Sequence, residues 1–146
     1  MLFVDGQAPE IFGCVLAHED IEEWKVKVDQ RQVIGQSEIL PVLVAKLTWS
    51  EKLKDRRVLF FVDNESAKIA LIRAYSLVVA SLKMVMESAA WDHHNNCGSW
   101  YSRVPTVCNI ADELSRMTVG EYLKSLGAKI VRPKLPKGKA PTRYLK

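Results

Sequence analysis

The sequence predicts a mixed α/β fold in which helices flank a five-stranded sheet made of an antiparallel meander and parallel strands. First, segments with the periodicity of strands and helices follow one another in the order β-β-β-α-β-α-α-β-α-α. Second, short connections join the early strands, which favours a meander, whereas helices separate the later strands, which favours parallel crossovers. Third, 146 residues with 48% hydrophobic and 26% charged content are typical of one domain with a single core.

Three short segments near the N-terminus predict the meander. Residues 1–4 are an apolar run that ends at the turn signal Asp5-Gly6, and apolar residues resume over 11–17. Residues 24–28 alternate apolar with charged side chains, which is the period of a strand exposed on one face. These segments are expected to be the first three strands.

The central part of the chain predicts a helix followed by a buried strand. Apolar residues from Leu40 to Leu47 recur at the spacing of one helical face, so a helix is expected over 37–50, with Pro41 tolerated near its start. Residues 57–62 are apolar after the first position and rich in β-branched and aromatic side chains. They predict a strand buried on both faces.

The C-terminal half predicts four helices and one more strand. The expected helices span 66–75, 77–91, 109–117 and 118–127, and the strand spans 100–104. Asn109 is expected to cap the third of these helices, and Thr118 with Glu121 has the form of a capping box for the fourth.

The charge of the chain is concentrated at its C-terminal end. Residues 129–146 hold seven Lys and Arg, three prolines and no acid, although the whole chain has a formal charge of only +4. We therefore expect an α/β domain over 1–128 and, over 129–146, a basic tail that is extended or disordered. Such a tail either contacts a phosphate backbone or is a solvated linker, and the composition favours the linker.

Several classes of protein are disfavoured by composition. The longest apolar region, 70–86, is interrupted by Arg73 and Lys83, so no membrane span is expected. Three cysteines without a Cys-x-x-Cys pair disfavour both a disulfide framework and a zinc finger. The chain start has no charged region of the kind that opens a secretion signal. We expect an intracellular protein, cytoplasmic or nuclear, with no membrane association.

Four acidic residues occur where a strand ends or a helix begins: Asp5, Glu38, Asp63 and Asp112. Each by itself is explained by a turn, a cap or the helix dipole. In α/β folds, however, such positions face one edge of the sheet, and four converging carboxylates repel one another unless divalent cations neutralise them. The set therefore predicts a site for Mg²⁺ or Mn²⁺, whose preferred ligands are hard oxygens.

Three segments carry a resemblance to a known family. They are Gln36-Ser-Glu-Ile-Leu40, the stretch Val58-Leu-Phe-Phe-Val-Asp-Asn-Glu-Ser-Ala67, and Arg103-Val-Pro-Thr-Val-Cys-Asn-Ile-Ala-Asp-Glu-Leu-Ser-Arg116. Together they resemble the ribonuclease H domains of retroelement reverse transcriptases, over about residues 2–117. The resemblance implies the ribonuclease H-like fold and two Mg²⁺ ions, with Mn²⁺ as a substitute, bound by Asp5, Glu38, Asp63 and Asp112 as the catalytic residues.

The resemblance also implies residues that contact substrate. Positions like those of Ser37, Asn64 and Asn109 contact the RNA 2′-hydroxyl or backbone in that family, although helix capping explains them equally well. Arg116 either contacts substrate or pairs with Asp112 one turn earlier, and the spacing favours the pair. Two departures from the family stand out: residues 104–110 hold no histidine, and 81–90 offer only Lys83 in place of a basic substrate-binding segment.

The predicted function is hydrolysis of the RNA strand of RNA:DNA hybrids. The expected partners are the hybrid and an upstream reverse transcriptase domain in the same polyprotein, since the chain begins directly on its first strand; no stable protein partner is evident. One alternative is a catalytically degenerate module that binds nucleic acid or supports a polymerase. Another is a DNA-directed nuclease or integrase of the same superfold.

Overall fold

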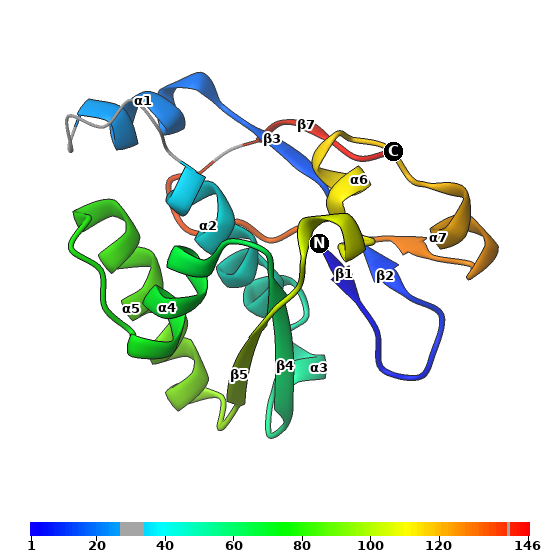
Figure 1. Cartoon of the computed structure of the whole chain (residues 1–146), viewed down its shortest axis with the longest axis horizontal. Helices are drawn as coiled ribbons and strands as arrows, with labels where there is room; N and C mark the ends of the chain where they lie inside the picture. Colours follow the sequence, from blue (N-terminus) through cyan, green and yellow to red (C-terminus); the bar gives the residue numbers. More distant parts are fainter. Residues whose placement is uncertain (27–33, 140) are drawn as a thin grey trace.

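The computed structural model describes residues 1–26, 34–139 and 141–146 and confirms a mixed α/β fold (Figure 1). The helices are α1 (His18–Val26), α2 (Ile34–Thr48), α3 (Ser50–Leu53), α4 (Glu65–Arg73), α5 (Val79–His94), α6 (Asp112–Ser115) and α7 (Glu121–Ser125), with a 3₁₀ turn, η1, at Thr106–Cys108. The strands are β1 (Leu2–Phe3), β2 (Glu10–Ile11), β3 (Cys14–Leu16), β4 (Arg57–Val62), β5 (Gly98–Arg103), β6 (Lys129–Ile130) and β7 (Pro141–Tyr144).

The strands form three small sheets, and the predicted five-stranded sheet is not formed by the described residues. β2 pairs antiparallel with β1 and parallel with β6, β3 pairs antiparallel with β7, and β4 pairs parallel with β5. The predicted second strand is divided at Gly13, where an added Cβ would lie 2.9 Å from the carbonyl oxygen of Leu114. Leu114 belongs to α6, so this close approach of two backbone segments requires a residue without a side chain at the point that separates β2 from β3.

The predicted strand at 24–28 is wrong where the structure describes it. Trp24 lies in α1, and residues 27–28 fall outside the described residues. Glu19 and Asp20 occupy the first turn of α1, where carboxylates interact favourably with the helix dipole. Trp24 is 5% exposed in the main core, so its burial is achieved on a helix rather than on one face of a strand.

The strand over β4 is predicted to the residue, but its expected burial on both faces is wrong. Phe60 and Val62 are buried, whereas Leu59 and Phe61 are 51% and 61% exposed. β4 and β5 pair in register over six residues each, and α4 and α5 make the connection between them. In Figure 1 these two helices lie on one side of the strand pair, with β1 and β2 on the other side.

The main core is centred on α2, which packs against α4 and α5. The helix is confirmed, and Leu40, Leu43 and Val44 of the predicted face are all at most 5% exposed. Leu47 is only partly buried, and Val42 and Ala45 are buried as well, so burial is not confined to one face. A smaller cluster of buried residues joins the C-terminal helices to the first sheet: Ile11, Leu114, Leu123 and Leu145. Within the described ranges, no helix is both long and apolar enough to cross a membrane.

The segment expected as a basic tail is extended, and it lies against the rest of the chain. β6 pairs with β2, and β7 pairs with β3. Lys139 Nζ lies 2.9 Å from Asp20 Oδ1 and 3.0 Å from Glu23 Oε2, so two of the acids of α1 neutralise one of the tail's cations.

One buried cation ties α2 to the elements around it. The side chain of Lys46 has no exposed surface, and its Nζ lies 2.6 Å from Asp92 Oδ2. The same ammonium donates to Ser88 Oγ at 2.8 Å and to the Tyr101 hydroxyl at 2.9 Å. It also lies 5.5 Å from the ring centroid of Phe60. A charge in the interior is tolerated only when it is paired and hydrogen-bonded, and here α5, β4 and β5 supply those partners.

Replacing Lys46 with Met is therefore expected to lower the free energy of unfolding by about 3 kcal/mol, because Asp92 loses its buried counter-ion. Urea denaturation followed by circular dichroism measures the change. Lys124→Met, which breaks the surface pair with Glu121, is the matched control and is expected to cost less than about 1 kcal/mol. Equal losses in the two variants would contradict the central role of Lys46.

Candidate functional site

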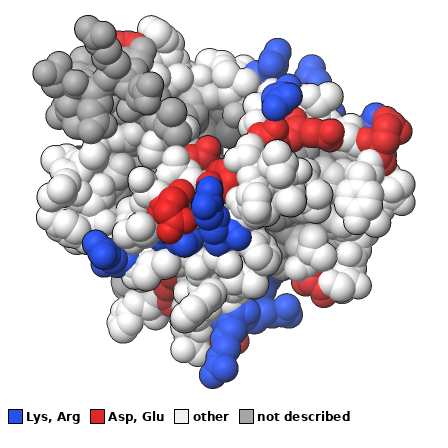
Figure 2. Space-filling view, in the orientation of Figure 1, with Lys and Arg blue, Asp and Glu red and all other residues white. Residues whose placement is uncertain are grey.

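A cavity of about 310 Å³ opens where α2, the end of β4 and the start of α6 meet. Glu38, Asp63 and Asp112 line it, together with Ser37 and Asn109. Figure 2 shows acidic side chains at the centre of the view, where these elements meet in Figure 1. Three of the four acids predicted from the sequence are thus brought together from distant parts of the chain.

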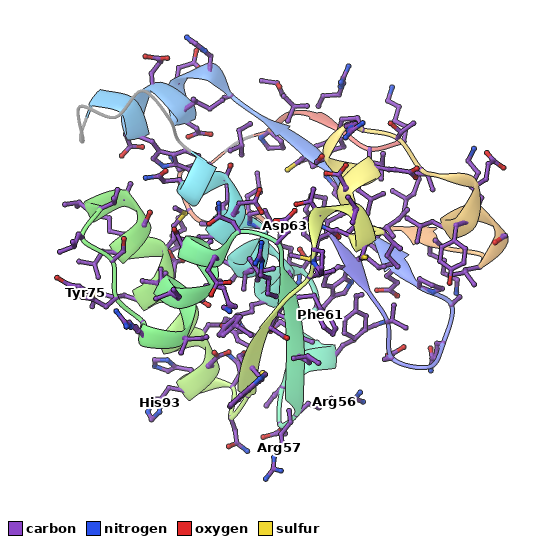
Figure 3. The ribbon with its side chains drawn as sticks, viewed as in Figure 1. Arg56, Arg57, Phe61, Asp63, Tyr75 and His93 are labelled. Carbon is purple, nitrogen blue, oxygen red and sulfur yellow. The ribbon has the colours of Figure 1, made fainter. Side chains whose placement is uncertain are left out.

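Each acid of the cavity is placed by a different local feature. Asp63 follows the last residue of β4, where the buried side chain of Val62 fixes the strand against the core, and Figure 3 shows it beside α2. Glu38 lies on α2 next to Ile39, which is 1% exposed. Asp112 is the first residue of α6, held by Leu114 at 1% exposure. Buried apolar neighbours therefore fix all three positions.

The electrostatics of the cavity oppose further negative charge. Burial raises the pKa of Glu38 to about 7, assisted by the charge of Asp63, by a hydrogen bond between these two side chains, and by the charge of Asp112. A cation bound between these side chains would relieve the same repulsion.

Asn109 positions Asp63 instead of capping a helix. Its Nδ2 donates to Asp63 Oδ2 at 3.2 Å, and its Oδ1 accepts from the backbone N–H of Ala111 at 3.1 Å. The predicted helix over 109–117 is therefore wrong in its start: η1 precedes Asn109, and α6 begins at Asp112 with Ala111 as its N-cap. The predicted capping box at Thr118 is also absent, since α7 has Gly120 at its N-cap and no side-chain cap.

The other predicted substrate contacts have structural partners of their own. Asn64 Oδ1 accepts from the backbone N–H of Ala67 at 2.9 Å and caps α4. Arg116 Nη2 lies 2.9 Å from Asp112 Oδ2, which confirms the pairing that the spacing favours. The Arg116 side chain is 75% exposed, so this pair is a surface interaction that still leaves the guanidinium open to solvent.

Asp5 is not brought to the cavity. It is exposed in the turn after β1, where its Oδ1 accepts from the backbone N–H of Gln7 at 3.3 Å. Met1, at the other end of the same strand, lines the cavity. β1 therefore runs away from the three carboxylates, and Asp5 lies in solvent beyond its far end.

The donor types of the cavity fit a hard divalent cation, although the three carboxylates are not yet gathered around one point. Among residues 1–26, 34–139 and 141–146, no three His, Cys, Asp or Glu side chains are close enough together to hold a metal ion. Glu38 and Asp63 interact closely enough for Asp63 to help raise the pKa of Glu38. Asp112 faces the same cavity and would have to approach them to complete a coordination shell.

Phe61 is a residue of the cavity that the sequence analysis did not single out. It lines the cavity while remaining 61% exposed. The exposure of Phe61 was not predicted, because the uninterrupted apolar run of β4 indicated burial on both faces. The signal that was available is its spacing of two residues from Asp63, which places both side chains on one face of an extended chain.

Compared with known proteins, the chain matches no family model, and no curated protein or solved structure is significantly similar to it.

The raised pKa of Glu38 predicts how stability depends on pH in the absence of metal. The folded protein keeps this proton to about pH 7, whereas the unfolded chain releases it near pH 4.5, so stability falls as the pH rises between these values. Glu38→Gln removes the effect. At pH 8, with EDTA present, the variant is expected to be more stable than the wild type by about 1–2 kcal/mol, after allowance for partial solvent exposure, and by less at pH 5.

Thermal unfolding at a series of pH values measures this difference. Glu51→Gln, at an exposed position on α3 outside the cavity, is the matched control and should follow the wild type throughout. A Glu38→Gln variant that is less stable than the wild type at pH 8 would contradict the electrostatic account.

Proposed function

We propose that this chain hydrolyses the RNA strand of RNA:DNA hybrids with divalent metal ions, as the ribonuclease H domain of a retroelement reverse transcriptase. The main support for this proposal is that Glu38, Asp63 and Asp112 line one cavity although they come from three distant segments of the chain. The motifs around these acids, described above, add the resemblance to the family. A relation to the ribonuclease H-like fold, the RNA:DNA hybrid as partner, the upstream polymerase domain and the intracellular setting are all part of this proposal.

Metal ions fit the chemistry of the cavity. Two Mg²⁺ ions, or Mn²⁺ in their place, would supply activation of the attacking water and stabilisation of the departing 3′-oxygen. Glu38, Asp63 and Asp112 would hold them through carboxylate oxygens. Asn109 keeps one oxygen of Asp63 oriented, and Arg116 balances part of the charge of Asp112. The chain's own task is thus to hold oxygen ligands in a partly buried place against their repulsion.

Asp5 enters the proposal through the resemblance alone. It would reach a metal in the cavity only if the turn after β1 moved toward α2. In the structure that turn is fixed by the pairing of Leu2 with Ile11 and of Phe3 with Glu10. The geometry supports three carboxylates around one cavity, and a fourth would require this short hairpin to rearrange when metal and substrate bind.

The direct test is cleavage of a labelled RNA:DNA hybrid with Mg²⁺ or Mn²⁺, with duplex DNA, duplex RNA and single strands as controls. We expect the RNA strand of the hybrid alone to be cut, and Asp63→Asn to lose at least about 100-fold in rate, because the central metal ligand is weakened. Asp55→Asn is the matched control, since Asp55 is an exposed acid at the turn before β4. It should cut at the wild-type rate.

Two outcomes would contradict the proposal. Tight hybrid binding without cleavage under any metal would favour a catalytically degenerate module. Cleavage of duplex DNA in preference to the hybrid would favour a DNA-directed nuclease of the same superfold.

Metal binding also predicts a change in stability that needs no substrate. A cation that binds only the folded chain raises its melting temperature in proportion to the logarithm of concentration above the dissociation constant. We expect Mn²⁺ to raise the melting temperature of the wild type and of Asp55→Asn, and to have a much smaller effect on Asp63→Asn. The same increase in all three proteins would show that the ion binds elsewhere.

A further inference from the structure

The β4–β5 pair has one covered face and one bare face. The alternation of side chains puts Val58, Phe60 and Val62 of β4 toward the core. The bare face is the opposite one, made of Arg57, Leu59, Phe61, Gly98, Trp100 and Ser102. In the register of the pair, Leu59 lies opposite Trp100 and Phe61 opposite Ser102.

This bare face exposes large side chains that are normally buried. Trp100 is 73% exposed, Phe61 is 61% exposed and Leu59 is 51% exposed. A shallow hollow lies over its first half, lined by Arg57, Leu59 and Trp100 among others. Neighbouring large apolar side chains that remain exposed are typical of a surface that binds a partner.

Basic side chains stand at the start of the bare face. Arg56 and Arg57 are exposed, and within the ranges that the structure describes neither forms an ion pair. In Figure 3 they extend away from the body where β4 begins, and Figure 2 shows Lys and Arg side chains gathered at that lower end of the molecule. An anionic partner is therefore favoured over a neutral or basic one.

The bare face leads directly into the carboxylate cavity. Phe61 belongs to both, since it lies on the bare face and lines the cavity beside Asp63. From Arg57 to Asp63 an extended chain covers about 20 Å. A ligand lying along β4 would thus contact arginine at one end and aromatic rings in the middle, and its far end would reach the mouth of the carboxylate cavity.

We propose that the bare face of β4 and β5 binds an unpaired strand of nucleic acid that adjoins the hybrid. Phe61 and Trp100 stack on bases, and Arg56 and Arg57 contact phosphates; exposed aromatic rings on a sheet beside basic side chains are the common means of binding single strands. The direction of the strand toward the cavity rests on the proposed function. Its binding to the bare face does not, because no carboxylate takes part in it.

Trp100 is a built-in probe for this binding. Trp24 and Trp49 are each 5% exposed, and Trp91 is half-buried, so Trp100 is the indole most open to a ligand. We expect an unlabelled oligothymidylate of about 12 nucleotides to quench the intrinsic fluorescence of the full chain. Trp100→Phe should lose most of the quenching while keeping most of the affinity, because phenylalanine still stacks.

The affinity itself is measured by anisotropy of the same oligonucleotide carrying a dye. Trp100→Ala and Phe61→Ala are each expected to bind about ten-fold more weakly. Tyr122→Ala is the matched control, because Tyr122 on α7 is as exposed as Phe61, at 61%, but lies outside the bare face. It should bind as the wild type does.

Three results would overturn the inference. In the first, the wild type does not bind the oligonucleotide up to about 1 mM. In the second, Trp100→Ala and Phe61→Ala bind it as well as Tyr122→Ala does. In the third, the chain binds no oligonucleotide and instead dimerises in a way that the same two substitutions abolish, so that a second copy covers the face. Hybrid cleavage without strand binding overturns this inference alone, whereas strand binding without cleavage overturns only the proposed function.

Discussion

The buried ammonium of Lys46 is the interaction on which the arrangement of the main core depends. It sits on α2 and is bound by Asp92 and Ser88 of α5 and by Tyr101 of β5. An uncompensated charge at this depth would cost several kcal/mol, so α2 is held in the one position where all of these partners are reached. Glu38 lies two turns before Lys46 on the same helix, and its place at the end of β4 follows from that constraint.

The carboxylate cavity imposes the opposite requirement on the same helix. Lys46 is surrounded by groups that attract its charge, whereas Glu38 lies near Asp63 and Asp112, which repel it. Burial together with this repulsion raises the pKa of Glu38 to about 7. Folding energy from the core therefore holds acids together that would separate by themselves. This is the usual arrangement of functional sites, whose local cost is offset elsewhere in the structure. The bare face of β4 and β5 also has a local cost that the core offsets. Trp100 and Phe61 are exposed there, so they contribute little to stability.

Local patterns in the sequence predicted those parts of the fold that local forces determine. β4 was predicted to the residue because β-branched and aromatic side chains are bounded by charges on both sides. The helix α2 followed from helical spacing, and the pairing of Arg116 with Asp112 followed from their separation of four residues. The convergence of Glu38, Asp63 and Asp112 followed from the places of these acids at the ends of elements.

The failures all involve contacts between distant segments or competing local signals. The alternation after Trp24 resembles a strand, but the acidic turn before it starts a helix. Pairing of β6 with β2 and of β7 with β3 leaves no local signature, so the extended C-terminal segment gave no hint of where it lies. The position of Asp5 depends on the length of β1. Because β1 has two residues and then turns, Asp5 lies in the turn and away from the cavity.

The central claim is that Glu38, Asp63 and Asp112 form one metal site. Anomalous diffraction from crystals of the full chain soaked in Mn²⁺ tests it most directly. The account predicts an anomalous peak in the cavity at about 2.0–2.6 Å from oxygens of Glu38 and Asp63, with Asp112 drawn toward it. Mn²⁺ bound only at other acids, or absent from the cavity at millimolar concentration, would contradict the claim.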